Sequence, residues 1–239
     1  MRRLHSRQIV FIILLALSLA SRVNGKSTDK DEIEQALKAI ASGSAAEMKS
    51  RLFTHSITFW NEEFRAQAIN SLPAAVRDQR LIEGKLLRRV ETVFQQVLQL
   101  QGRSGKVELF IFQHDVPMAP QLWRGCVLMI SAGLAELLYE GELAGIIAHE
   151  LGHSYFEDEM AAANRNQETS TMRLVELKCD GVAILSLKLL GHNPTHFLRG
   201  LQRIQEINRR KRLFKGILQS HPELVARARF SDRLIKLLG

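Results

Sequence analysis

The stretch covering residues 142–156 constrains this chain more than any other, because it contains His149-Glu150-Leu151-Gly152-His153. In an α-helix, residues four positions apart lie on the same face, so His149 and His153 can direct two imidazoles at one metal ion. Glu150 lies between them in sequence, and its carboxylate can stand beside a metal-bound water. The spacing predicts a helix that supplies two zinc ligands and a general base.

An alternative is a core helix with two histidines that make ordinary buried contacts. Three polar side chains would then lie in an apolar core without evident partners, which is energetically costly. The apolar residues that flank the motif are Leu143, Ala144, Ile146, Ile147, Ala148 and Leu151. Their number favours the metal site over this alternative.

Two acidic residues follow on a second predicted helix, residues 173–190. Glu176 and Asp180 are four apart and therefore share a face. A zinc site with two histidines needs a third protein ligand, and Glu176 is the candidate. Asp180 can accept a hydrogen bond from a ligand imidazole and hold its tautomer. The alternative, an exposed face with two acids, fits poorly with the apolar neighbours.

The chain of 239 residues is long enough for one sizeable domain. Residues 1–25 combine a basic start with an apolar run from Ile9 to Ala20, a pattern typical of a secretory signal peptide. An uncleaved anchor is the alternative. We therefore expect an exported protein of the periplasm or cell envelope, membrane-associated if the segment is retained. We expect residues 26–101 to form the N-terminal helical part of one domain and residues 102–239 to form the core that carries the metal site.

The N-terminal helical part is interpreted as packing scaffold. Ser44 and Glu47 predict a capping box. Pro73 is acceptable in the first turn of a long helix. The apolar stripe expected on that helix comprises Ile82, Leu86, Val90, Val93 and Val97.

Two β-type runs follow, residues 107–112 and 126–131, and the link between them is predicted to be a loop because it contains Pro117, Pro120 and Gly125. An exposed edge strand before the metal helix could pair with an extended peptide. The predicted substrate-binding residues are Val127, Leu128, Met129, Ile130 and Ser131; the alternative is a strand without a ligand. The expected fold class is α+β and mostly helical. Residues 157–171 are polar and predict a mobile excursion.

The C-terminal region is strongly basic. Residues 199–239 contain eleven Lys and Arg against three acids, a formal charge of +8 that equals the charge of the whole chain. Such a region could meet anionic lipids, acidic substrates or nucleic acid, although a solvated helix face is the usual explanation. Export argues against nucleic acid. Cys126 and Cys179 could pair or remain two separate buried thiols.

The order of the motifs resembles a known family. His149-Glu150-x-x-His153 followed by Glu176-x-x-x-Asp180 resembles the gluzincins. The flanks are similar to the HtpX and CAAX prenyl endopeptidase group, which includes mitochondrial Oma-type and periplasmic BepA-type proteases. Three further segments agree with this group: residues 127–134, Gly191-His-Asn-Pro194, and His221-Pro222 with Arg227.

The resemblance implies a zinc endopeptidase with a gluzincin catalytic domain and one Zn²⁺ per chain. It implies that His149, His153 and Glu176 bind the zinc, that Glu150 is the base, and that Asp180 lies behind a ligand. It places His221 near the metal, as a catalytic residue or a cap, with Arg227 as its support. Family members commonly have Asn-Ala before the edge strand, where this chain has residues 116–119, Val-Pro-Met-Ala.

Two functions of different classes follow from these observations. The first is a peptidase that hydrolyses polypeptide substrates, above all misfolded or unassembled proteins. The second is a non-proteolytic, chaperone-like zinc protein in which His221 occupies the remaining metal position. The intact Glu150 favours the enzyme, since a binding protein does not need that carboxylate.

Overall fold

A computed structural model describes residues 29–41, 43–54, 61–211 and 222–239 of the chain. This part is mostly helical and contains one three-stranded mixed sheet, which confirms the predicted α+β class. The segment predicted to be a signal peptide, residues 1–25, and His221 lie outside the described residues. The elements are α2 (Asp29–Ile40), α3 (Ala45–Phe53), α4 (Glu62–Asn70), α5 (Ala74–Arg77), α6 (Lys85–Leu100), β1 (Glu108–Phe112), β2 (Gln121–Trp123), β3 (Val127–Ser131), α7 (Ala132–Leu137), α8 (Glu140–Gly152), the 3₁₀ turn η1 (His153–Tyr155), α9 (Glu157–Asn166), α10 (Thr169–Leu189), α11 (Thr195–Lys211) and α12 (Leu224–Leu238).

The sheet is buried on both faces. Successive strand residues point to opposite faces, so alternate side chains of β3 enter different clusters. Val127 and Met129 pack with Ala68 of α4, whereas Leu128 and Ile130 join the main core. That main core contains residues from both the N-terminal helical part and the segment after residue 102.

The position of β3 differs from the prediction of an exposed edge. The strand order is β1-β3-β2, with β1 parallel and β2 antiparallel to β3. The main-chain groups of β3 are therefore engaged on both sides, and all five residues are buried. The predicted substrate-binding strand, comprising Val127, Leu128, Met129, Ile130 and Ser131, cannot pair with a substrate in this arrangement.

The cause is β2, which lies inside the link predicted to be a loop. A tight turn at Arg124 and Gly125 brings β2 back against β3, and both residues have positive φ, 48° and 69°. Type I′ hairpin turns need this conformation at both central positions. The strand has only three residues, too few for a visible period of two.

The long helix expected after Pro73 is divided. α5 ends at Arg77, and α6 begins only after Gly84, whose φ is 114°. The intervening segment pairs with β1 instead: the Leu81 N–H donates to the Ile111 carbonyl at 2.8 Å. Ile82 is consequently exposed, while the stripe on α6 is buried as predicted at Val90, Val93 and Val97. Phe94 and Leu98 of α6 are buried as well.

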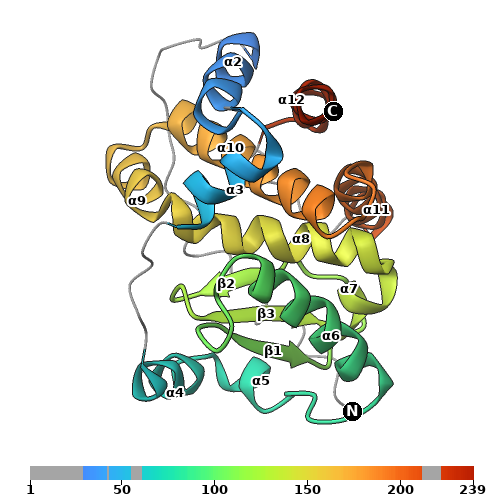
Figure 1. Cartoon of the computed structure of the whole chain (residues 1–239). Coiled ribbons are helices and arrows are strands. Elements are labelled where there is room, and N and C mark those ends of the chain that lie inside the picture. Colours follow the sequence, from blue (N-terminus) through green and yellow to red (C-terminus); the bar gives the residue numbers. More distant parts are fainter. Residues whose placement is uncertain (1–28, 42, 55–60, 212–221) are drawn as a thin grey trace.

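The helix that carries the histidines lies between the sheet and the C-terminal helices. Figure 1 shows α8 running beside β2, with α10 packed along its other side. α11 and α6 also contact α8. A helix enclosed in this way is apolar on nearly all sides, which explains its sequence.

The polar segment after His153 is helical rather than an irregular excursion. α9 covers most of it, and its start is tied to α10 by the Lys178 Nζ–Glu159 Oε2 ion pair at 2.5 Å. The capping box of α3 at Ser44 and Glu47 is present as predicted.

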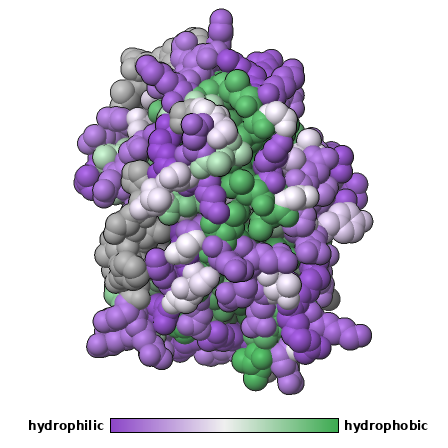
Figure 2. Space-filling view, viewed as in Figure 1, coloured by the Kyte–Doolittle hydropathy of each residue, from purple (hydrophilic) through white to green (hydrophobic). Residues whose placement is uncertain are grey.

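Figure 2 shows one face that is mostly hydrophilic, with hydrophobic residues gathered along its middle. Within the described residues, no helix combines the length and apolar character needed to cross a membrane.

Gly133 provides a test of how the strand is joined to the metal helix. Its N–H donates to the His114 carbonyl at 2.8 Å, and an added Cβ would lie 2.4 Å from the carbonyl oxygen of Asp115. We expect Gly133→Ala to lower the free energy of unfolding by about 1–3 kcal/mol, as overpacking does. Urea unfolding measures this change.

Gly200→Ala is the matched control, because an added Cβ there would meet its nearest neighbour at 3.4 Å, an ordinary contact. In a helix interior this substitution should be neutral or stabilise by up to about 1 kcal/mol. Equal losses in the two variants would contradict the assigned clash at Gly133.

Candidate metal centre

The metal helix is fixed at its start by a buried carboxylate. Glu142 accepts the Tyr139 N–H at 3.0 Å, and its other oxygen accepts Nε of Arg203 at 2.9 Å. These contacts satisfy one of the free N–H groups at the helix start and tie α8 to α11. The start of α8 is therefore held at a fixed position relative to α11.

At its other end, α8 approaches α10 closely. An added Cβ at Gly152 would lie 3.2 Å from Cα of Cys179, so the missing side chain permits the approach. α8 ends at Gly152, and the 3₁₀ turn η1 begins at the next residue, His153. The close packing allows side chains from α8, η1 and α10 to meet.

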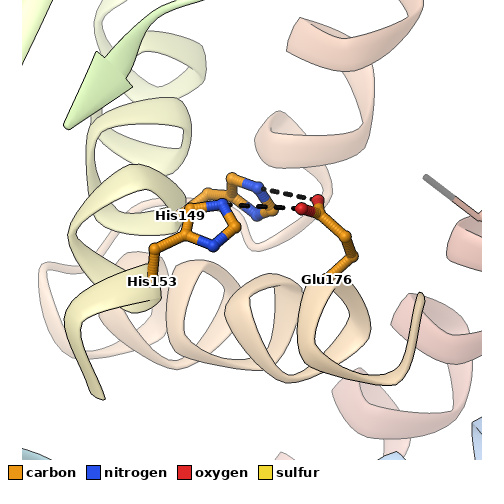
Figure 3. Close-up of side chains that lie close together, drawn as sticks. All are labelled: His149, His153 and Glu176. Carbon is orange, nitrogen blue, oxygen red and sulfur yellow. Dashed lines mark ion pairs between the residues drawn. The ribbon is translucent and has the colours of Figure 1, made fainter. Parts of the chain in front are cut away.

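The structure brings His149, His153 and Glu176 together, as Figure 3 shows. His149 Nε2 lies 3.4 Å from Glu176 Oε2, and His153 Nε2 lies 3.6 Å from Glu176 Oε1. Nitrogen and oxygen ligands at about 2.0–2.1 Å from a tetrahedral zinc are about 3.4 Å apart, so the spacing fits such an ion. Elsewhere in the described residues no other group of three His, Cys, Asp or Glu side chains is arranged in this way.

Access to this group is one-sided. The His149 and Glu176 side chains are 6% and 5% exposed, whereas that of His153 is 26% exposed. Glu150, the predicted base, is partly exposed and interacts electrostatically with both His149 and Glu176. A substrate would thus reach the group from the side of His153 and Glu150.

Behind His149 lies a buried chain of charges. His149 Nδ1 is 2.9 Å from Asp180 Oδ1, which leaves Nε2 directed toward Glu176. Arg227 donates Nε to Asp180 Oδ2 at 2.8 Å and Nη2 to Oδ1 at 2.5 Å. The structure thus places Asp180 between His149 and Arg227, and Asp180 is the ion-pair partner of Arg227 among the described residues.

Two contacts at the histidines were missed from the sequence. Phe197 of α11 stacks on His149 with ring centroids 5.6 Å apart and an interplanar angle of 22°. Cys179 Sγ lies 3.6 Å from His153 Nδ1. Cys179 follows Glu176 by three residues and so shares its face, a signal that was available. Phe197 has no comparable signal, because only tertiary packing brings it to His149.

The question of the two cysteines is resolved by their positions. Both are free and buried. Cys126 packs in the cluster between the sheet and α4, while Cys179 contacts His153. The thiols are therefore separate.

The electrostatics of the group favour a bound cation. Burial by itself lowers the pKa of His149, but Asp180 and Glu176 outweigh burial and raise that pKa to about 9. Metal binding must therefore displace a proton from His149 at neutral pH. Burial raises the pKa of Glu150 to about 7; His149 acts against this rise and Glu176 acts with it.

The buried pair of Arg227 and Asp180 can be tested by Arg227→Met. Removing the cation leaves a buried carboxylate unpaired, and we expect a loss of about 3–5 kcal/mol in the free energy of unfolding. Because Asp180 supports a metal ligand, metal affinity should also fall by about 10–100-fold. Urea unfolding and competition with a chelator measure the two effects.

Arg233→Met is the control on the same helix. Arg233 pairs with Glu34 at 2.5 Å, but both side chains are about half exposed, 47% and 52%. Solvent screens such a pair, so neither stability nor metal affinity should change appreciably. Similar losses in both variants would refute a special role for Arg227.

Comparison with known proteins supports the metal-centre interpretation. Residues 85–179 match the sequence model of peptidase family M48, and this segment includes His149, Glu150, His153 and Glu176. A search of curated proteins found no match. The match over residues 85–179 and the His-His-Glu group within it, which could bind a metal ion, together support a metallopeptidase domain of the M48 type in this segment.

Proposed function

We propose that this protein is a zinc-dependent endopeptidase of the HtpX and CAAX prenyl endopeptidase type. The observation that supports the proposal most is the convergence of His149, His153 and Glu176 beside Glu150. Two imidazoles and one carboxylate form a donor set that zinc enzymes use, and it leaves a position for water. We propose one zinc ion per chain at these three residues.

The residues of the chain divide the catalytic work. A zinc ion bound here would lower the pKa of a water toward neutrality and polarise the scissile carbonyl. Glu150 would take the proton of the attacking water and then give it to the leaving amine. Asp180 would hold the His149 ring through Nδ1, so that Nε2 keeps its lone pair for the metal. Arg227 orients the Asp180 carboxylate through two hydrogen bonds.

The substrate would pair with β2 rather than with β3. The outer side of β1 is engaged by the segment around Arg80 and Leu81. β2 pairs only with β3 among the described strands, and it lies next to α8 in Figure 1. Trp123 fixes the strand by donating Nε1 to the Ala68 carbonyl at 3.2 Å and to Ser71 Oγ at 3.1 Å. We infer that an extended polypeptide adds to this edge.

The place of action is proposed from the sequence. The basic and apolar start of the chain supports export to the cell envelope, and the resemblance to quality-control peptidases supports misfolded or unassembled proteins as substrates. In the basic region, Arg209 and Arg210 are 74% and 70% exposed although both contact Glu206. This exposure supports a contact with an anionic membrane surface.

Glu150→Gln tests the proposed activity. We expect about one zinc per chain in both proteins, because Glu150 is not a ligand. Cleavage of unfolded casein should fall by about 10²–10⁴-fold in the variant, since the general base is lost. Metal analysis and an assay of casein fragments give the two results.

The three outcomes separate the competing functions. Zinc with cleavage that depends on Glu150 supports the peptidase. Zinc without any cleavage rejects the peptidase in favour of the chaperone-like zinc protein. Absence of zinc in both proteins refutes the metal centre itself.

Backbone-modified peptides test the proposed substrate strand. In paired strands, alternate N–H groups face the neighbouring strand. N-methylation should therefore reduce kcat/KM by about tenfold or more at every second amide of a cleaved peptide, which corresponds to about 1.4 kcal/mol for each lost contact. Losses that do not alternate along the peptide would contradict pairing with β2.

A further inference from the structure

Two buried polar residues lie just beyond the end of α6, outside the metal-binding group. Gln101 and Arg103 are each 1% exposed. Among the residues that the structure describes, Arg103 is the largest fully buried side chain. Large polar side chains are seldom buried without a specific set of contacts, so their partners are informative.

The partners of Arg103 are the residues on either side of His153. Its Nη1 donates to the Leu151 carbonyl at 2.9 Å and to Ser154 Oγ at 2.5 Å. Its guanidinium carbon lies 3.9 Å from the centre of the Tyr155 ring. Arg103 thus contacts the last turn of α8 and the whole of η1 except the histidine itself.

Gln101 extends this contact to α10. The Tyr155 hydroxyl donates to Gln101 Oε1 at 3.2 Å, and Gln101 Nε2 donates to Ser186 Oγ at 3.2 Å. Residues 101 and 103 therefore connect η1 with the helix that supplies Glu176.

The backbone at His153 needs such support. α8 ends at Gly152 and η1 begins at His153, so the second histidine lies at a change of helix type. Carbonyl groups at a helix end lack intrahelical partners, and such ends fray unless other groups bind them. A rotation at this junction would move the His153 imidazole away from His149 and Glu176.

The charge of Arg103 is balanced in an unusual way. No carboxylate pairs with it in the described ranges, and its Nε and Nη2 have no hydrogen-bond partner there. Burial lowers the pKa of Arg103 to about 10. The compensating groups are the negative C-terminal end of α8 and the face of Tyr155. Burying a charge without a partner carboxylate costs free energy, and the contacts of Arg103 with the turn at residues 151–155 offset that cost.

We propose that Arg103 is a positioning residue for the second histidine ligand: it holds the Leu151 carbonyl and the Ser154 hydroxyl, and thereby fixes the turn that carries His153. This inference rests on the metal group of the proposed function but not on peptidase activity. Its test therefore measures metal binding.

Arg103→Met removes the donors and retains most of the apolar volume. We expect the zinc Kd, measured by competition with a chromophoric chelator, to rise by about 10–100-fold, as for other supports of metal ligands. The visible spectrum of bound Co²⁺ should also change, because this spectrum reports the arrangement of the ligands around the metal, and His153 is one of them. Arg103→Lys should recover part of the affinity, since a point charge replaces the planar fork.

Arg173→Met is the matched control. Arg173 donates Nε to the buried Glu32 at 3.0 Å and joins α10 to α2, away from η1. Arg173 precedes Glu176 by one turn of α10, but its side chain contacts Glu32 of α2 and shares no partner with Arg103. The variant should therefore destabilise the protein to urea while the zinc Kd changes by less than about threefold. A general loss of stability would weaken zinc binding in both variants equally.

The result that overturns the proposal is an unchanged Kd in folded Arg103→Met, or an equal rise in Arg173→Met. If Arg103→Met does not fold, Ser154→Ala is the deciding variant, since it removes one acceptor of Arg103 from the same turn. This variant should raise the zinc Kd. An unchanged Kd refutes the proposal. Zinc binding that responds to Arg103 without any cleavage would reject the peptidase and support this inference. A wild-type protein that binds no zinc would overturn both.

Discussion

The rest of the site depends on the close packing of α8 against α10. Gly152 has no side chain to separate the helices, and the approach to Cys179 brings ligands from two distant segments within reach of one ion. α8 is enclosed by the sheet, α6, α10 and α11, so it cannot slide or rotate freely. Metal and catalytic groups need placement to within about 0.5 Å, and dense packing supplies it.

The two histidines are held by different means. His149 lies in the interior, where Asp180 faces Nδ1 and Phe197 covers the ring. His153 lies nearer to solvent, at the junction of α8 and η1, and its neighbours along the chain are bound by Arg103. The first ligand is therefore oriented through its own ring, whereas we propose that the second is oriented through its backbone. This difference follows from burial, because the His149 ring is enclosed on more sides than the His153 ring, which contacts Cys179 and is partly open to solvent.

The errors of sequence interpretation have a common physical origin. β2 is only three residues long, and the segment around Leu81 joins the other side of the sheet by isolated hydrogen bonds. Neither segment is long enough to show the alternation of apolar and polar residues that would reveal a strand. The polarity of residues 157–171 suggested an irregular loop, but a helix can be polar on most sides when one face and one ion pair, Lys178 with Glu159, hold it.

Spacing along the chain was sufficient to predict the mostly helical α+β class, the buried stripe of α6, and the placing of His149 and His153 on one helix face, since these depend on local helical geometry. The need for a third zinc ligand pointed to Glu176, but only the packing of α8 against α10 brings that carboxylate to the histidines. Tertiary structure alone decided which strand is the edge, that Arg227 meets Asp180, and that Phe197 and Arg103 support the two histidines. Such contacts join residues far apart in sequence, and the local spacing of apolar and polar residues does not predict them. They arise only when the helices pack against one another and against the sheet.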